Sequence, residues 1–596
     1  VNFMYWRYFM WNFAGRQNDN QNRYGEVENG NWITGFNFID KLLVGGDNDL
    51  LPDSLAGKGH NVFYCLPLLL GLLGLFWQIG KGREGTHQFI VVLALFFMTG
   101  LAIVVYLNQT PLQPRERDYA YAGSFYAYAI WIGMGVAAIA EWLGRLAGKK
   151  VAPVIAAVLC LLVPVQMVSQ TWDDHDRSGR YACRDFGQNY LSSMPEQGCP
   201  VIFTNGDNDT FPLWYNFETE GFRTDARCCN LSYLNTDWYI DQMKRPAYKS
   251  PALPISFSRI DYQTGTNDFV TISPEDKDIL LKNNSREAVE KSFELHNVMD
   301  YWIRQHHMIP TDTIWLKIDK DAVLRSGMKI PEKYLGATDE ETKAKMPDRM
   351  IISLKGRSAL TKSEIMMLDL IAQCNWERPL YMATTVPSSS YLGLGNYFLL
   401  EGLAYRITPF DWKAATGNSH GSVDTDKMYA NIKNFKFGGL DNPDVYLDET
   451  NRRMCQSLRR LASQLSIELF NGGKKDKALE VLEIVHKGIC DEVLPMDDAI
   501  YGSTAEIANV YLGLGKKDRA ADILIQTTEN YLQLMRWYLS MNNRNLRHSA
   551  KDFSDAASIQ YSYVFPIKEK CVDKELYDKL FADWQRMCDE FEHRIN

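Results

Sequence analysis

A chain of 596 residues is too long for one compact core and predicts several domains, at roughly 100–200 residues each. Hydrophobic residues make up 46% of the chain and charged residues 23%, which excludes a wholly disordered protein. The formal net charge of −9 argues against nucleic acid as a partner, because nucleic-acid binders carry a basic surface.

Residues 1–61 begin with a run of aromatic side chains and continue as a loop rich in Asn and Gly. No charged segment followed by an apolar one marks a signal peptide, and we expect the natural protein to begin further upstream. We predict an external loop with an aromatic, amphipathic segment here. Arg16 and Asp19, directly after the aromatic run, are candidates for sugar binding. The alternative is an amphipathic helix lying at the membrane interface.

Apolar stretches follow in close succession at residues 62–80, 88–107, 124–143 and 151–171. A helix needs about 20 apolar residues to cross the roughly 30 Å hydrocarbon core of a bilayer, and each stretch approaches that length. Helices buried in a soluble core can be this apolar, but a soluble domain does not need four of them in a row. We therefore predict a membrane domain of four spans over residues 62–171, with the lipid bilayer as a partner.

The orientation of these spans follows from the basic residues in the short connections. The first and third connections carry Lys81, Arg83, Arg145, Lys149 and Lys150. Both connections are therefore expected to face the cytoplasm. The second connection, residues 108–123, and everything after residue 171 are then expected to lie outside.

The external connection contains four consecutive charged residues, Arg115, Glu116, Arg117 and Asp118. Charged groups beside a bilayer are costly unless they are paired or functional. Two guanidinium groups suit a lipid-linked phosphate, and a neighbouring carboxylate suits a general base. Arg115 and Arg117 are therefore candidates for substrate binding, and Glu116 and Asp118 are candidates for catalysis. The alternative is mutual ion pairing that anchors the loop.

Residues 172–410 read as an α/β domain. A short apolar strand at 200–204, a helix at 210–218 and a second strand at 226–231 form the pattern of a βαβ unit with parallel strands. Further elements are predicted as a helix at 236–244, strands at 313–318, 350–354 and 379–384, and a helix at 362–373 capped by Thr361 and Glu364.

Asp207 and Asp209 follow the first of these strands, at the edge where α/β folds place ligands. Their carboxylates are candidates for substrate binding or for a divalent ion, and Asp209 is alternatively the cap of the next helix. A metal-dependent phosphatase using both residues lacks a nucleophile and His partners. We predict no metal, and no divalent ion as a cofactor.

The segment Trp172–Arg177 combines one His with several Asp just after the last span. Its composition suits a metal, but consecutive residues cannot all converge on one ion, which favours a solvated helix terminus. Cys183 and Cys199 could form a disulfide in an oxidising compartment. They are alternatively unpaired thiols.

Residues 411–450 are rich in Gly, Asn and Asp and predict a connector. Beyond them, residues 451–596 show helical periodicity. The decapeptide GKKDKALEVL at 473–482 returns as GKKDRAADIL at 515–524, each time between two helical patterns. This repetition predicts helix–turn–helix repeats of tetratricopeptide type, which bind protein partners in their concave groove.

Four motifs carry a family resemblance: RYFMWNFAGRQND at 7–19, PRERDYAYAGS at 114–124, WDDHDRSGR at 172–180 and TNGDNDTFP at 204–212. Together they resemble a bacterial family of multispanning envelope proteins whose animal relative is a protein O-mannosyltransferase. The resemblance covers nearly the whole chain. It implies an incomplete GT-C type membrane domain followed by the α/β domain and the all-α repeats.

The resemblance also implies a function and a location. The donor would be a polyprenyl-phosphate sugar, and the acceptors would be Ser or Thr hydroxyls of exported proteins. The protein would lie in the bacterial inner membrane with its large C-terminal part in the periplasm. GT-C enzymes carry their catalytic acid after the first span, so the main general base is expected outside this chain. The alternative is a non-catalytic envelope scaffold.

Overall fold

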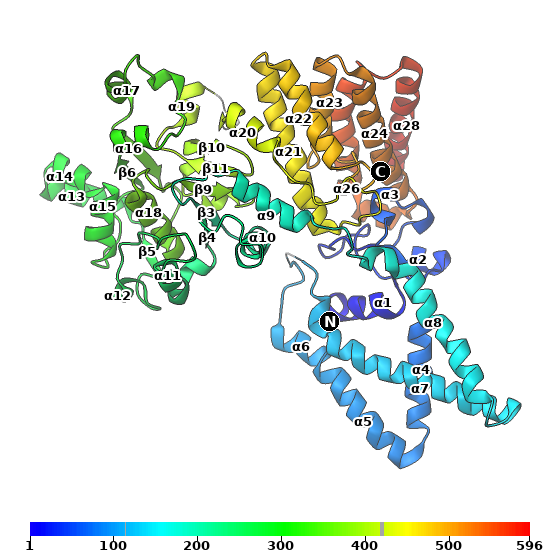
Figure 1. Cartoon of the computed structure of the whole chain (residues 1–596). Helices are drawn as coiled ribbons and strands as arrows, with labels where there is room; N and C mark the ends of the chain where they lie inside the picture. Colours follow the sequence, from blue (N-terminus) through cyan, green and yellow to red (C-terminus); the bar gives the residue numbers. More distant parts are fainter. Residues whose placement is uncertain (114, 418–421, 596) are drawn as a thin grey trace. The chain divides into compact units, whose positions relative to one another are not determined.

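We describe a computed structural model of the chain, which covers residues 1–113, 115–417 and 422–595 (Figure 1). Pro114 of the charged loop and residues 418–421 of the predicted connector lie outside the described residues, and of residues 146–147 only the backbone is described. The chain divides into two compact units. One comprises residues 1–180, 442–460 and 489–596, and the other comprises residues 181–441 and 461–488.

Three helical segments of the first unit are long and apolar enough to cross a membrane (Figure 1, blue to cyan). They cover Gly82–Leu107, Asp118–Arg145 and Ala152–His175. The first is built from α5 (Gly82–Met98) and α6 (Leu101–Leu107), the second covers most of α7 (Ala122–Ala147), and the third is α8 (Ala152–His175). These segments agree with three of the predicted spans and support a membrane-embedded region.

The predicted span over residues 62–80 is not confirmed. Its helix α4 covers only Leu66–Ile79, and a helix of 14 residues is about 21 Å long, short of the hydrocarbon core. The preceding residues are held elsewhere, because β2 (Asn61–Val62) pairs with β1 (Gly15–Arg16) in an antiparallel ladder. The helix then begins after a left-handed residue at Cys65.

Helices α4 and α7 cross at glycine residues, which lets their backbones touch (Figure 1). A Cβ atom on Gly74 would lie 1.8 Å from the carbonyl oxygen of Trp131, and one on Gly135 would lie 2.1 Å from that of Leu70. Backbone atoms cannot give way as a flexible side chain can. The close crossing therefore requires glycine at both positions.

Gly74→Val is expected to lower the stability of this helix pair by about 3 kcal/mol, the upper end for overpacking, because no rotamer removes the clash with the backbone. The control is Gly133→Val on α7, where an added Cβ meets no atom within 4 Å. Thermal melting of the full chain in detergent measures the difference. Equal melting temperatures for the two variants would contradict the crossing.

The aromatic opening is helical, and its side chains pack in the core of the membrane region. Residues Asn2–Trp6 make a π-helical turn that continues into α1 (Arg7–Phe13). The buried aromatic cluster joins this helix to α5 and α7 through Tyr5, Tyr8, Phe9, Trp11, Phe13, Phe96, Tyr121, Tyr128 and Trp131. The amphipathic helix predicted at the interface is thus packed against the spans. Two short helices follow in this unit, α2 (Asn37–Leu43) and α3 (Asp53–Ala56).

The second unit is built on a six-stranded mixed sheet of order β12-β10-β11-β9-β3-β4. Strand β3 (Val201–Thr204) leads through α10 (Asp207–Glu218) to the parallel strand β4 (Arg227–Asn230), which confirms the βαβ unit. The parallel strand β9 (Leu380–Ala383) lies on the other side of β3. The remaining strands are β10 (Phe398–Leu400), β11 (Ala404–Ile407) and β12 (Ser422–Val423).

Helix α18 (Lys362–Cys374) has the predicted capping box, since Thr361 and Glu364 satisfy each other's backbone N–H groups. Two separate antiparallel pairs complete the strands: β5 (Phe269–Thr271) with β8 (Ala359–Thr361), and β6 (Thr313–Lys317) with β7 (Arg349–Ser353). The other helices are α9 (Ala182–Ser192), α11 (Asp237–Met243), α12 (Arg259–Tyr262), α13 (Lys277–Asn283), α14 (Arg286–Ser292), α15 (Leu295–Asn297), α16 (Lys320–Arg325) and α17 (Asp339–Lys345).

The range predicted as a connector, residues 411–450, contains regular structure. It holds α19 (Trp412–Thr416), strand β12 and α20 (Thr425–Ile432). Strand β12 pairs in parallel with β10 and so belongs to the main sheet. The Gly, Asn and Asp content of this range therefore marks tight turns between short elements.

The two copies of the decapeptide adopt the same local structure. Helix α21 (Glu449–Asn471) precedes α22 (Lys475–Gly488), and α23 (Thr504–Gly513) precedes α24 (Lys517–Leu539). Both turns contain a glycine with positive φ, +76° at Gly473 and +78° at Gly515. The helix pairs are thus present, and the tetratricopeptide assignment stays a prediction. The chain ends with α25 (Asn543–His548), α26 (Ala550–Ile559), α27 (Phe565–Lys568) and α28 (Lys574–Ile595).

Lys568 is fully buried in this helical region, and its Nζ has no hydrogen-bond partner among the described residues. Loss of hydration lowers the pKa of Lys568 to about 8. The unfolded chain binds this proton up to its ordinary pKa, so stability should rise between about pH 8 and about pH 10.5.

Lys568→Met is therefore expected to raise the free energy of unfolding at pH 7 by an amount on the order of 3 kcal/mol. The gain should shrink as the pH approaches 10, where the buried amine of the original protein is neutral. Melting curves of both proteins at pH 7 and pH 10 measure the difference in stability between Lys568→Met and the original protein. A stability difference that is the same at both pH values would rule out a buried ammonium group at Lys568.

Candidate functional site

Glu116 of the charged loop is held by donors from the N-terminal region. The guanidinium of Arg7 donates to both carboxylate oxygens, with N–O distances of 2.9 and 2.6 Å. The hydroxyl of Tyr8 and the backbone N–H of Asn22, at 2.9 Å, donate to the same carboxylate. Because Arg7 is only 5% exposed, the pair is nearly buried and fixes the loop on α1.

The neighbouring arginines are more exposed than Arg7. Arg115 is exposed, and its guanidinium lies 5.9 Å from the ring centre of Tyr119. Arg117 donates through Nη1 to the hydroxyl of Tyr119 at 2.6 Å and through Nε to the side chain of Gln113 at 3.4 Å. Both arginines thus gather around Tyr119, immediately before α7, and Asp118 begins the short 3₁₀ turn that leads into that helix.

A second ion pair connects two of the sequence motifs. Arg16 donates to Asp174 at 2.6 Å, and Asn61 donates to the same carboxylate oxygen at 3.0 Å. The ring Nδ1 of His175 lies 2.6 Å from the other oxygen of Asp174. Asp174 is buried, so this ion pair holds the end of α8 against the loop after α1.

Asp19 lies in the loop that this pair anchors. Its carboxylate accepts a hydrogen bond from the hydroxyl of Tyr446, and burial together with this carboxylate raises the pKa of Tyr446. The backbone N–H of Gln21 donates to Glu449 at 2.7 Å. The loop is therefore tied to the start of α21 as well as to the membrane helices.

Asp207 and Asp209 lie on the other unit and do not converge. Asp209 accepts the N–H of Gly206, the residue before α10, at 3.0 Å, and the hydroxyl of Thr385 at 2.8 Å. It therefore connects the loops that follow the parallel strands β3 and β9, and burial raises its pKa. Asp207 is exposed on the first turn of α10.

The structure thus fixes Glu116 and the backbone of Arg117 on the N-terminal region, and it pairs Arg16 with Asp174. Sequence reasoning missed Arg7, although one cation inside an aromatic run is itself a signal for a buried partner. Cys183 and Cys199 are both thiols. Within residues 1–113, 115–417 and 422–595, no group of three or more His, Cys, Asp or Glu side chains is placed to hold a metal.

The comparison with protein families concerns the sheet-bearing unit, from α9 to α20. Residues 183–427 match the family model described as TMEM260-associated domain 2. The TMEM260-associated domain is linked to an animal O-mannosyltransferase-like membrane protein, and the match supports a relation of this chain to such a protein. No curated protein and no solved structure matches the chain.

Proposed function

We propose that the chain belongs to a membrane glycosyltransferase that moves a mannose-like sugar from a polyprenyl-phosphate donor to Ser or Thr hydroxyls of exported proteins. The observation that carries the proposal is the placement of Arg115 and Arg117 at the head of α7, outside the buried Arg7–Glu116 pair. Two guanidiniums next to a membrane span suit a phosphate whose lipid tail stays in the bilayer.

In this proposal the oxygen of the acceptor hydroxyl forms a bond to the anomeric carbon of the sugar. The bond between that carbon and the phosphate oxygen breaks, and polyprenyl phosphate leaves with the electron pair. Arg115 and Arg117 stabilise the negative charge that grows on the phosphate. The hydroxyl proton passes to a carboxylate.

The structure supports different roles for the two acidic residues of the loop. Glu116 is already engaged by Arg7, Tyr8 and the amide of Asn22, so we assign it to positioning the loop. Asp118 begins the turn next to the arginines and is the carboxylate of this loop that we assign to orienting the acceptor hydroxyl. In the proposed location, the bacterial inner membrane, this loop faces the periplasm.

A non-catalytic scaffold is the second candidate. The closed ion pairs Arg7–Glu116 and Arg16–Asp174 favour it, because they hold the external loops in place without leaving those carboxylates available. In that case the α/β unit and the helical repeats would bind partner proteins, and the spans would only anchor them.

Glycoproteomics of exported proteins separates these two functions. Cells that carry the gene are compared with cells that lack it and with cells in which the deleted gene is restored. Loss and recovery of an O-linked glycan on Ser or Thr is the result that the transferase predicts. An identical set of glycans in all three would favour the scaffold.

A further inference from the structure

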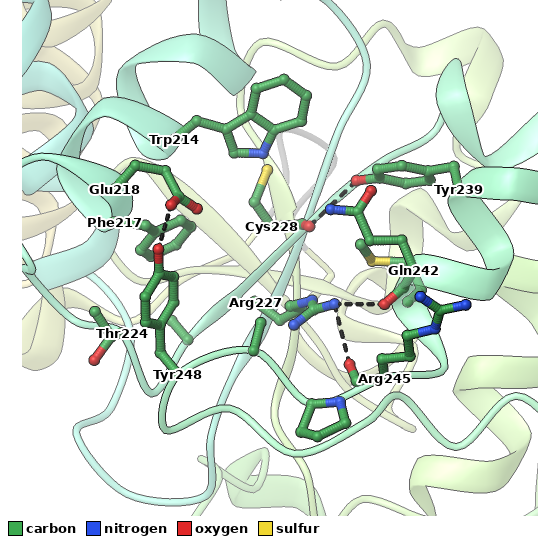
Figure 2. A pocket seen from close by; sticks show the side chains of 14 residues that line it. Trp214, Phe217, Glu218, Thr224, Arg227, Cys228, Tyr239, Gln242, Arg245 and Tyr248 are labelled. Atoms are coloured by element: carbon green, nitrogen blue, oxygen red, sulfur yellow. Dashed lines mark hydrogen bonds between the residues drawn. The ribbon is translucent and has the colours of Figure 1, made fainter.

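The sheet-bearing unit contains a cavity beside its edge strand β4. Its volume is about 240 Å³, and it is lined by the C-terminal half of α10, the start of β4, the end of α11 and the loop that follows α11. Figure 2 shows the guanidinium of Arg227 in the middle of the lining side chains. This site is separate from the loop of the proposed transferase, and the inference does not rest on that function.

Arg227 is buried without full compensation of its charge. Its side chain is 6% exposed, and Nη2 donates to the carbonyl oxygens of Gln242 at 2.8 Å and Arg245 at 3.2 Å. Nη1 is buried and has no hydrogen-bond partner among the described residues. A buried donor without a partner is costly, and more so when it is charged. Loss of hydration lowers the pKa of Arg227 accordingly.

The side chains that line the cavity carry more positive than negative charge. Glu218 is the one carboxylate among the residues that line it, and that carboxylate accepts a hydrogen bond from the hydroxyl of Tyr248. Arg245, which is exposed, adds a second guanidinium to the rim. Two cations therefore face one carboxylate that is already engaged.

Aromatic side chains form much of the remaining wall, with Trp214 and Phe217 on one side (Figure 2). Flat apolar surfaces suit a sugar ring or another small ring. A volume of about 240 Å³ lies below the range of roughly 300–1,000 Å³ typical of sites for drug-sized ligands. The cavity therefore suits a ligand of monosaccharide size.

We infer that this cavity binds a ligand of monosaccharide size that presents one anionic group, a carboxylate or a phosphate, to Arg227. The anion supplies the acceptor that Nη1 lacks, and its charge strengthens the bond. Because Nη1 is buried, we expect the exposed side chain of Tyr248 to move when the ligand enters.

Isothermal titration of the full chain in detergent tests the inference with the probes glucuronate, glucose 6-phosphate and glucose. We expect glucuronate or glucose 6-phosphate to bind, and neutral glucose to bind at least about tenfold more weakly, as a charge-assisted hydrogen bond implies. The two anionic probes tell a carboxylate site from a phosphate site. Failure of both to bind, or equal binding of glucose, would overturn the inference.

Two variants assign the binding to this cavity. Arg227→Gln should lower the affinity for the preferred anionic probe at least about tenfold. Thr224→Trp should lower that affinity by a similar factor, because the larger side chain fills the cavity while Arg227 stays in place. If Arg227→Gln does not fold, Thr224→Trp decides. The control Arg286→Gln changes an exposed arginine of α14 and should bind like the original protein. Unchanged binding of the probe by Thr224→Trp would show that the probe does not bind in this cavity.

Discussion

Glu116→Ala is expected to destabilise the membrane region by about 3–5 kcal/mol, because it leaves Arg7 buried without its counter-charge. The hydroxyl of Tyr8 and the amide of Asn22 lose their acceptor in the same step. The total free energy of unfolding of a native protein is only about 5–15 kcal/mol, so this loss is a large share of it. Thermal melting of the full chain in detergent, followed by protease sensitivity of the loop around residues 113–117, measures the loss.

The double variant Arg7→Met with Glu116→Leu is the matched control. It removes both charges and leaves no buried ion behind, so the double variant should lose less stability than Glu116→Ala alone. Glu116→Gln, which keeps the shape and an acceptor oxygen, should fall between the original protein and Glu116→Ala. A Glu116→Ala protein that melts like the original would show that the pair contributes nothing to the loop.

Replacing Arg115 and Arg117 together by Gln is expected to lower sugar transfer at least roughly 100-fold, the order found when one donor to a developing charge is removed. Arg115 is exposed and Arg117 is half-buried, and the side chain of Arg117 bonds to Gln113 and Tyr119 of the same loop. The variant should therefore keep the melting temperature of the original protein while it loses activity. Transfer to an acceptor peptide from a polyprenyl-phosphate sugar measures the rate.

Arg145→Gln is the control for this pair. Arg145 lies at the opposite end of the segment that contains α7, where it is exposed and pairs only loosely with Glu141 at 3.6 Å. Its loss removes the same charge and should leave the transfer rate unchanged. If the double variant transfers sugar as fast as the original protein, Arg115 and Arg117 take no part in the mechanism.

Local patterns in the sequence predicted much of the fold. The βαβ unit from β3 to β4 follows from two short apolar runs around one helix, and its parallel pairing is confirmed. The capping box of α18 follows from Thr361 and Glu364 at the correct spacing. Three spans follow from uninterrupted apolar stretches. Each of these features depends on residues close together in the chain.

Features that depend on distant residues were not predictable in this way. Helix α4 is shorter than its apolar stretch because Asn61 and Val62 pair with Gly15 and Arg16, some 45 residues earlier in the chain. The pairing of β11 with β9 and of β12 with β10 joins segments that no local pattern connects.

The candidate site shows the same division. The sequence marked Arg115, Glu116, Arg117 and Asp118 as a cluster of chemical interest, but not that Glu116 would pair with Arg7, across more than 100 residues. Asp209 was expected either to bind a ligand or to cap a helix, and in the structure its carboxylate accepts the backbone N–H of Gly206 at the start of α10. Arg227 carried no signal at all, since only the packing of α11 over β4 makes it a buried cation.

Binding of a polyprenyl phosphate to the purified full chain tests the central claim most directly. We predict that the original protein and Arg145→Gln bind the lipid phosphate with the same affinity, and that the double variant of Arg115 and Arg117 binds it at least about tenfold more weakly. Equal binding by all three proteins, or no binding by the original, would contradict the assignment of this loop to a lipid-linked donor.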